Sequence, residues 1–392
     1  MNKLQELIGN LCPNGVRYKK LSELCISLKK GTLKTTDLKE NGKYPVINSG
    51  RELYGFYDEF NNKNAITFAA RGEYAGYISY FKDEFWAGGL CYPYSSKDEN
   101  IITNKFLYYY LKSKENIIME KLVARGGIPA LNKVDLDRFM VAVPPLDVQC
   151  EIVHILDAIT SLSAELRSEL EARKKQFNYY RDELIKKAPG VEYKTLGEIS
   201  TEMYRGAGIK RDEVTSSGIP CVRYGEIYTT YNVLFDTCVS HTNEEKQKSK
   251  KFFGYGDVLF AITGESVEEI GKSTVYLGTD KCLAGGDIVV MKHEQNPKYI
   301  AYALSTTEAQ FQKSKGKVKS KVVHTSVPAL KEISIPIPSL EEQERIANLI
   351  EKFDIICNDM ISGIPAEIEK REKQYEYYRD KLLSFKEVEV NE

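Results

Sequence analysis

The 392-residue sequence is poor in the residues that build metal sites and disulfide frameworks. It has four histidines, and none of its eight cysteines forms a CxxC pair. Without closely spaced His and Cys residues, a structural zinc site is not expected. The first thirty residues also lack the apolar stretch of an export signal. We therefore expect a cytoplasmic protein with reduced thiols.

Long apolar runs and a large net charge are also missing. No run of about 18 apolar residues occurs, so a membrane span is not expected. The 55 Lys and Arg residues nearly balance the 56 Asp and Glu residues. No global positive field therefore marks a nucleic-acid-binding protein, and such a surface would require local segregation of charge.

Motifs of self-contained enzymes are absent as well. The segment GESVEEIGKS (264–273) ends like a phosphate-binding loop, but Ser266 stands where that motif requires its first glycine. We interpret it as a turn between strands. There is no N-P-P-[YF] tetrad of adenine methyltransferases, no G-x-G-x-x-G and no nuclease-like acidic cluster. These absences argue against a catalytic chain.

The sequence does contain an internal repeat. QFNYYRDELI (176–185) returns as QYEYYRDKLL (374–383), and VPPLDVQCEI (143–152) returns as IPSLEEQERI (337–346). The segment GVRYKKLSEL that begins at Gly15 matches GVEYKTLGEI from Gly190. The chain is thus one unit written twice: an entry segment, a long variable segment, and a P-x-L-x-x-Q motif that leads into a helix.

The variable segments have short apolar runs between glycine-rich turns, which predict strands at 64–70, 75–81, 257–263 and 287–292. Each segment closes with a predicted helix, at 104–113 and 297–306, whose aromatic residues we assign to the core. We therefore predict an α+β fold with two similar α/β domains. The expected divisions are 1–143 and 190–337 for these domains, and 144–189 and 338–392 for the helical regions.

Heptad spacing of apolar residues, as in Ile152, Ile159 and Leu166, predicts long coiled-coil helices in both helical regions. The offset between the copies grows from 194 to 198 near SGIPAE (362–367), which predicts a kink or a brief break there. A narrow apolar stripe must be covered, and the simplest cover is the other copy. We expect an antiparallel helix pair and internal pseudo-twofold symmetry.

Positive charge is segregated in one stretch. Residues 309–324 contain Lys313 and four further lysines without any Asp or Glu. Such a loop suits the phosphate backbone of DNA; a solvated surface loop is the alternative. Arginines in other loops could read guanine, although each alone could equally be structural. The candidate DNA-binding residues are Lys29, Lys30, Lys34, Arg71, Tyr74, Arg125, Arg205, Lys210, Arg211, Arg223, Lys315, Lys317, Lys319, Lys321 and His324.

The motifs that open and close the two helical regions resemble those of the specificity subunit of type I restriction-modification enzymes. The resemblance covers essentially the whole chain. It implies a non-catalytic subunit that binds a bipartite double-stranded DNA target, one half per domain. It also implies that two modification subunits, which methylate adenine with S-adenosylmethionine, dock on the helices. Restriction subunits would add ATP- and Mg-dependent translocation and cleavage.

For the repeated YYRD segments, we expect Tyr180 and Tyr378 to lie in the apolar stripe while the arginine and aspartate face partner helices. The candidate partner-binding residues are Tyr179, Arg181, Asp182, Tyr377, Arg379 and Asp380. Two other classes of protein remain open. One is a self-contained DNA methyltransferase or nuclease in which these domains only target, and the other is a coiled-coil scaffold without DNA specificity.

Overall fold

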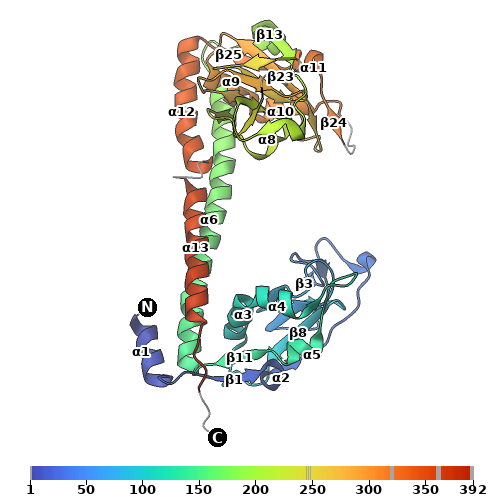
Figure 1. The fold of residues 1–392 in the computed structure, drawn as a ribbon, viewed down its shortest axis with the longest axis vertical. Helices are drawn as coiled ribbons and strands as arrows, with labels where there is room; N and C mark the ends of the chain where they lie inside the picture. Colours follow the sequence, from blue (N-terminus) through green and yellow to red (C-terminus); the bar gives the residue numbers. More distant parts are fainter. Residues whose placement is uncertain are drawn as a thin grey trace. The chain divides into compact units, whose positions relative to one another are not determined.

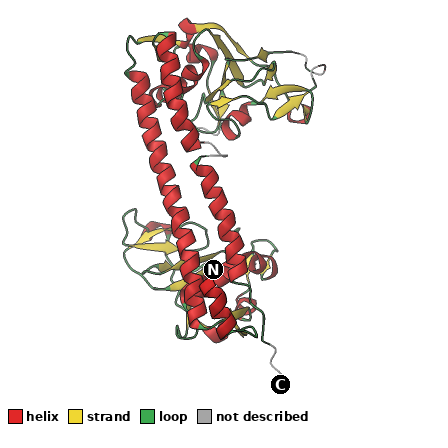
Figure 2. Ribbon diagram, turned by 90° about the vertical axis from the view of Figure 1, so that its left-hand side faces the viewer, coloured by secondary structure: helices red, strands yellow, loops and turns green. Residues whose placement is uncertain are grey.

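The computed structural model describes residues 2–243, 245, 247, 249–317, 322–358 and 363–388. The chain divides into two compact units (Figure 1). Unit 1 comprises Met1–Leu166 with Ile368–Glu392, and unit 2 comprises Arg167–Glu367. Helices and strands are mixed in both units (Figure 2), which confirms the predicted α+β class.

Unit 1 begins with a helix that the sequence patterns did not predict, α1. Its elements are α1 (Asn2–Leu11), β1 (Arg17–Lys20), α2 (Leu21–Leu24), β2 (Cys25–Ser27), η1 (Thr35–Asp37), β3 (Tyr44–Ile47), β4 (Gly55–Tyr57), β5 (Ala65–Ala69), β6 (Ile78–Phe81), β7 (Trp86–Ala87), β8 (Cys91–Ser96), α3 (Asn104–Ser113), α4 (Glu115–Lys121), β9 (Val123–Ala124), β10 (Ala130–Leu131), α5 (Lys133–Asp137) and β11 (Met140–Val143).

Unit 2 follows the same order with additional short strands. Its elements are β12 (Glu192–Thr195), α7 (Leu196–Ile199), β13 (Ser200–Arg205), η2 (Arg211–Glu213), β14 (Val214–Thr215), β15 (Ile219–Val222), α8 (Tyr224–Thr229), β16 (Leu234–Phe235), β17 (Ser240–Thr242), β18 (Phe252–Phe253), β19 (Val258–Ala261), β20 (Thr263–Gly264), β21 (Ser273–Tyr276), β22 (Cys282–Ala284), β23 (Ile288–His293), α9 (Pro297–Leu304), α10 (Thr307–Ser314), β24 (Val323–His324), α11 (Val327–Lys331) and β25 (Ser334–Ile337).

The sheets of the two units correspond strand by strand. In unit 1 a sheet of order β2-β8-β5-β6 is accompanied by a β4-β3-β7 sheet and a β1-β11 pair. Unit 2 has the order β13-β23-β19-β21, extended by β16, with β17-β15-β22 inside a second sheet and a β12-β25 pair. Both β3 and β15 pair with one antiparallel and one parallel neighbour. The repeat read from the sequence is therefore a repeat of topology.

A long helix, α6 (Leu146–Lys186, 41 residues), starts in unit 1 and ends in unit 2. The second copy of the helical region consists of α12 (Leu340–Asn358) and α13 (Ile364–Leu382), so the predicted break is confirmed. Residues 359–362 between them lie outside the described residues.

The helices are antiparallel within each unit. In unit 1, Leu382 at the end of α13 shares a core cluster with Val148 near the start of α6. In unit 2, Ile346 near the start of α12 shares a cluster with Ile185 near the end of α6. Figure 1 shows α12 running alongside this end of α6. The stripe is well covered only near these ends, because Ile159 and Leu166 in the middle of α6 are half-buried.

The P-x-L-x-x-Q motif fixes the start of each long helix through its glutamine. Gln149 and Gln343 are both fully buried. Each side-chain amide donates to the carbonyl of the proline five residues earlier, Pro144 or Pro338, at 2.8 and 2.9 Å. Each Oε1 accepts the backbone N–H of Thr103 or Asn296, the N-cap residues of α3 and α9, at 3.0 Å. The glutamine therefore ties the long helix to the variable segment that precedes it.

The other sequence-based assignments of elements also hold. The predicted helix at 104–113 coincides with α3, and the segment after Gly264 lies between β20 and β21 as expected. The aromatic residues of α3 and α9, such as Phe106 and Tyr299, are buried in the core. The seven cysteines whose side chains are described are free thiols. Among the described helices, none is long and apolar enough to cross a membrane.

Candidate nucleic-acid interface

The first basic segment of each unit occupies an equivalent place after the first strand of the main sheet. Gly31 donates to the carbonyl of Ala87 at 2.8 Å, and Ala207 donates to that of Ala284 at 2.9 Å. The segment with Lys29, Lys30 and Lys34 therefore matches the segment with Arg205, Lys210 and Arg211. At equivalent positions, Lys34 and Lys210 precede the short helices η1 and η2. All six side chains are exposed.

Two of these six side chains already have partners in the fold. The Arg205 guanidinium donates to the carbonyl of Gly286 and to Asp287 Oδ1, both at 2.5 Å. The Lys30 ammonium donates to the carbonyl of Gly89 at 3.1 Å and lies 5.0 Å from the centroid of the Tyr92 ring. Arg205 is therefore held through Nε and one terminal nitrogen, which leaves it less free than the other five side chains to bind bases.

The second pair of candidate loops is equivalent in the same way. Leu131 donates to the carbonyl of Ala70 at 2.9 Å, and Thr325 donates to that of Ile262 at 3.0 Å. The hairpin of β9 and β10, which carries Arg125, thus matches the lysine-rich segment that leads into β24. The structure places Arg71 beside this hairpin, because Arg71 bridges Ala130. Arg71 and Arg125 are both exposed.

The lysines and the histidine of the lysine-rich segment differ in their exposure. Lys315 is exposed, Lys317 is half-buried and His324 is exposed, with its Nδ1 3.1 Å from Thr263 Oγ1. Lys319 and Lys321 lie outside the described residues. Lys313 does not belong to the basic surface, which corrects the sequence-based interpretation.

Lys313 is only 4% exposed and lies on α10. Its ammonium donates to the carbonyl of Leu304 at 2.8 Å and to Ser273 Oγ at 3.1 Å. Burial lowers the pKa of Lys313 from 10.5 to about 7, with a smaller contribution from the positive charge of Arg181. Charge counting along the sequence could not reveal this, because the spacing of the lysines is uniform.

Tyr74 has a neighbour that the sequence analysis missed. The Arg51 guanidinium stacks over the Tyr74 ring at 4.8 Å and lies 5.6 Å from the Tyr77 ring. Arg51 comes from the loop between β3 and β4 and is exposed. Separation in sequence hid this cluster, since nothing in the pattern around residue 51 pointed to residue 74.

In unit 2, Arg211 and Arg223 line one pocket of about 580 Å³ together with Tyr224 and Asp287. Arg223 Nε donates to Glu226 Oε1 at 3.2 Å, and the buried Glu226 also accepts a hydrogen bond from Ser240 Oγ at 2.6 Å. The pocket thus brings together two candidate residues that are 12 positions apart.

The repeated YYRD segments differ in their surroundings. Tyr179 and Tyr377 are 62% and 60% exposed. Arg379 and Asp380 bind each other, and the Asp380 side chain is 62% exposed. Arg181, in contrast, is only 7% exposed, so the expectation that it faces outward is wrong.

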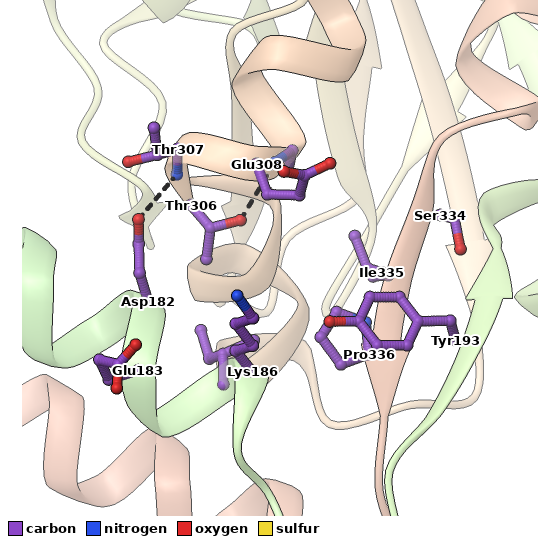
Figure 3. A pocket seen from close by; sticks show the side chains of 12 residues that line it. Asp182, Glu183, Lys186, Tyr193, Thr306, Thr307, Glu308, Ser334, Ile335 and Pro336 are labelled. Atoms are coloured by element: carbon purple, nitrogen blue, oxygen red, sulfur yellow. Dashed lines mark hydrogen bonds between the residues drawn. The ribbon is translucent and has the colours of Figure 1, made fainter.

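Arg181 is buried because unit 2 uses it internally. It donates to Asp182 Oδ1 from Nε and from a terminal nitrogen, at 2.9 and 2.7 Å. Asp182 Oδ2 in turn accepts the N–H of Thr307 at the start of α10, at 3.1 Å (Figure 3). Asp182 lines a pocket of about 400 Å³ with Lys186 and Tyr193. A carboxylate at a helix N-terminus is favourable, so this segment stabilises unit 2.

The two tyrosines expected in the apolar stripe are only partly covered. Tyr378 packs against the core cluster of unit 1. Tyr180 stacks with Phe353 at 6.4 Å between ring centroids but remains 45% exposed. No group of three His, Cys, Asp or Glu residues that could hold a metal ion is present in the described parts of the chain.

This fold, with two copies of a strand-rich domain each joined to a long helix, has known relatives. The family described as "Type I restriction modification DNA specificity domain" matches residues 13–172 and 189–370. The chain is 32% identical to the EcoR124I/EcoR124II specificity subunit of Escherichia coli, over 76% of this chain and 74% of that one. It is 30% identical to a putative type I specificity subunit of Haemophilus influenzae, over 79% and 78%.

Solved structures share the fold. The specificity subunit of M. genitalium superposes with a TM-score of 0.55 at 19% identity, over 94% of this chain and 96% of that one. A chain from a study of the assembly and conformational transition of the type I system gives 0.62 at 14% identity, over 95% and 98%. The chain belongs to the type I restriction-modification DNA specificity family. It is a specificity subunit, a type of protein without a catalytic site of its own.

Proposed function

We propose that the chain reads a bipartite double-stranded DNA target, with residues 1–143 reading one half-site and residues 190–337 the other. One observation carries this proposal: the candidate loops, chosen separately in each copy, occupy equivalent places in the two units. A repeated scaffold with equivalent but different loops suits two half-sites of different sequence.

The helical regions at 144–189 and 338–392 then recruit two modification subunits. The exposed Tyr179 and Tyr377 support this role, because exposed aromatic side chains are common anchors of protein interfaces. Arg379 and Asp380 remain candidates in unit 1, whereas Arg181 and Asp182 serve the fold of unit 2. Membership of the family supports S-adenosylmethionine on the modification subunits, ATP and Mg on restriction subunits, and action on DNA in the cytoplasm.

Methylation mapping tests the proposal directly. DNA from cells that express this chain with its modification subunits should carry methylated adenine in one interrupted motif. Cells that lack only this chain should lose that methylation. Loss of methylation without any sequence motif in the positive cells would contradict the reading function and leave a scaffold role.

The lysine-rich segment is proposed to contact phosphates. Replacing Lys315, Lys317 and Lys319 with Ala should weaken binding similarly for all DNA sequences. It should also flatten the salt dependence by up to about 0.9 in log-log slope for each lost contact. The matched control replaces Lys39 and Lys63, whose ammonium groups form ion pairs with Asp58 and Glu84. An unchanged slope in the triple variant would leave only a solvated loop.

A further inference from the structure

The loops that follow β3 in unit 1 and β15 in unit 2 are equivalent. Gly88 donates to the carbonyl of Ile47 at the end of β3, and Gly285 donates to that of Val222 at the end of β15, both at 2.8 Å. Ile47 and Val222 are related by an offset of 175, which also places Gly50 on Gly225. Each loop carries one arginine within the next four residues, Arg223 in unit 2 and Arg51 in unit 1.

In unit 2 the arginine is held by a buried carboxylate. Glu226 accepts the backbone N–H of Arg223 at 3.0 Å and its Nε at 3.2 Å. The Glu226 side chain is 8% exposed and the Arg223 side chain 32%. Among the described residues, the guanidinium is engaged through Nε, and the side chain lines the pocket of about 580 Å³. The terminal nitrogens of a guanidinium fixed in this way remain available for a bidentate contact.

In unit 1 the flat face of the Arg51 guanidinium lies over an aromatic ring. Arg51 stacks on Tyr74 at 4.8 Å, and Tyr77 beside it also carries the Lys112 ammonium at 3.8 Å from its centroid. Within the part of the chain that the structure describes, the Arg51 guanidinium donates no hydrogen bond. Stacking orients the plane of a guanidinium and leaves all its N–H donors free.

Other arginines of these surfaces lack this combination. Arg205 already uses Nε and one of its two terminal nitrogens to bind Gly286 and Asp287, so a pair of free terminal nitrogens is not left for a base. Arg71 and Arg125 are exposed beside a hairpin, with no ring or carboxylate among the described residues to orient them. Such side chains suit phosphates, whose oxygens accept hydrogen bonds from many directions.

We propose that Arg51 and Arg223 are the residues that specify a guanine, one in each half-site, and that Tyr74 and Glu226 are their positioning residues. This inference rests on the proposed function. An arginine presents two parallel donors to guanine O6 and N7, and each good pair discriminates against the wrong base by a factor of about 5 to 150. The two units would thus read the same base by different means of support.

The test is methylation of a randomised oligonucleotide library by the complex of this chain with its modification subunits. Arg51→Ala should relax one position of one half-site from guanine to several bases, and leave the other half-site unchanged. Arg223→Ala should do the same in the opposite half-site. The discrimination lost at that position should be about 5- to 150-fold. Arg17→Ala, an exposed arginine of β1, is the matched control and should keep the parental motif.

Positioning is tested by a second set of variants. Glu226→Ala and Tyr74→Leu should relax the same positions as Arg223→Ala and Arg51→Ala, whereas Glu226→Gln and Tyr74→Phe, which keep the acceptor and the ring, should restore guanine in large part. Lower methylation with an unchanged motif would show a merely structural role. If the parental complex reads a bipartite motif but both arginine variants keep it unchanged, the inference fails while the proposed function stands. If the parental complex has no motif, the proposed function itself fails.

Discussion

The two YYRD segments, 179–182 and 377–380, have the same four residues but different surroundings. In unit 2, Asp182 binds the N–H of Thr307 and Arg181 is buried. In unit 1, the Asp380 side chain is 62% exposed and pairs with Arg379. Sequence identity therefore preserved the helix but not the contacts, because the neighbouring variable segment decides which partners are available.

A second difference between the units is the side chain that packs against Gly76 in unit 1 and against Gly271 in unit 2. The Cβ of a residue at Gly76 in unit 1 would meet Met119, and one at the equivalent Gly271 in unit 2 would meet Lys313. One unit thus fills this position with an apolar side chain and the other with a buried ammonium. Burial of a charge is costly unless it is neutralised or well bonded, so the two units should differ in their response to pH.

The largest expected effect concerns the buried glutamine that the two units share, Gln149 in unit 1 and Gln343 in unit 2. Gln149→Leu or Gln343→Leu would remove three hydrogen bonds of a fully buried amide and leave the carbonyl of Pro144 or Pro338 and the N–H of Thr103 or Asn296 without that partner. At about 1 to 3 kcal/mol for each such group, either change should lower the free energy of unfolding by about 3 to 5 kcal/mol. Urea denaturation of the two variants measures this. Equal losses would support equivalent clamps, and a negligible loss in one variant would show that the corresponding helix start is held by other contacts.

The next effect tests the difference between the YYRD segments. Arg181→Ala removes the buried partner of Asp182 and should destabilise the protein by about 2 to 4 kcal/mol. Arg379→Ala removes a more exposed pair and should cost below about 1 kcal/mol. Thermal and urea unfolding give both values. Similar costs for the two variants would mean that burial of Arg181 does not contribute to stability as proposed.

The pH response of Lys313 should be of intermediate size. Its pKa in the folded state is lowered to about 7, whereas the unfolded chain keeps the ordinary value of 10.5. Between about pH 7 and 10 the unfolded state therefore binds more protons, and stability rises with pH. Below pH 7 both states are protonated and the full cost of the buried charge remains.

Lys313→Met, which introduces the residue found at the equivalent place in unit 1, removes this titration. The gain in stability over the parent should be largest near pH 6.5 and should shrink by on the order of 2 kcal/mol towards pH 9. Urea unfolding at several pH values is the measurement. A difference between variant and parent that stays constant with pH would contradict a neutralised, buried lysine.

The smallest expected effect concerns Tyr179 and Tyr377, which are similarly exposed in the two units. Tyr179→Ala and Tyr377→Ala should each weaken binding of a modification subunit by about 1 to 2 kcal/mol, roughly tenfold, without loss of stability. Titration with purified modification subunit measures the affinities. Tyr255→Ala, a 67% exposed tyrosine of unit 2, is the control. Unaltered affinity in both helix variants would move the docking site away from these tyrosines.

The sequence predicted the repeat, the helices and most of the strands because each depends on local pattern. Heptad spacing and the four-residue offset were enough to place the break between α12 and α13. The candidate loops also followed from composition, since loops with Gly, Lys and Arg between strands are exposed. The sequence showed Gln149 and Gln343 only as a glutamine common to both copies of the motif. Their role in fixing the helix starts could not be predicted, because several of their hydrogen-bond partners lie about 48 residues away in the chain.

By itself, the sequence determined that this protein is a twofold-repeated α+β chain with long helices and without the motifs of a self-contained enzyme. These properties follow from periodicity, offsets and composition, which are readable along one dimension. Tertiary structure alone decided that Arg181 is buried and Arg379 is not, that Lys313 faces the core, and that Arg51 meets Tyr74. Burial and stacking depend on residues distant in sequence, and the packing of each unit determines which of them become neighbours.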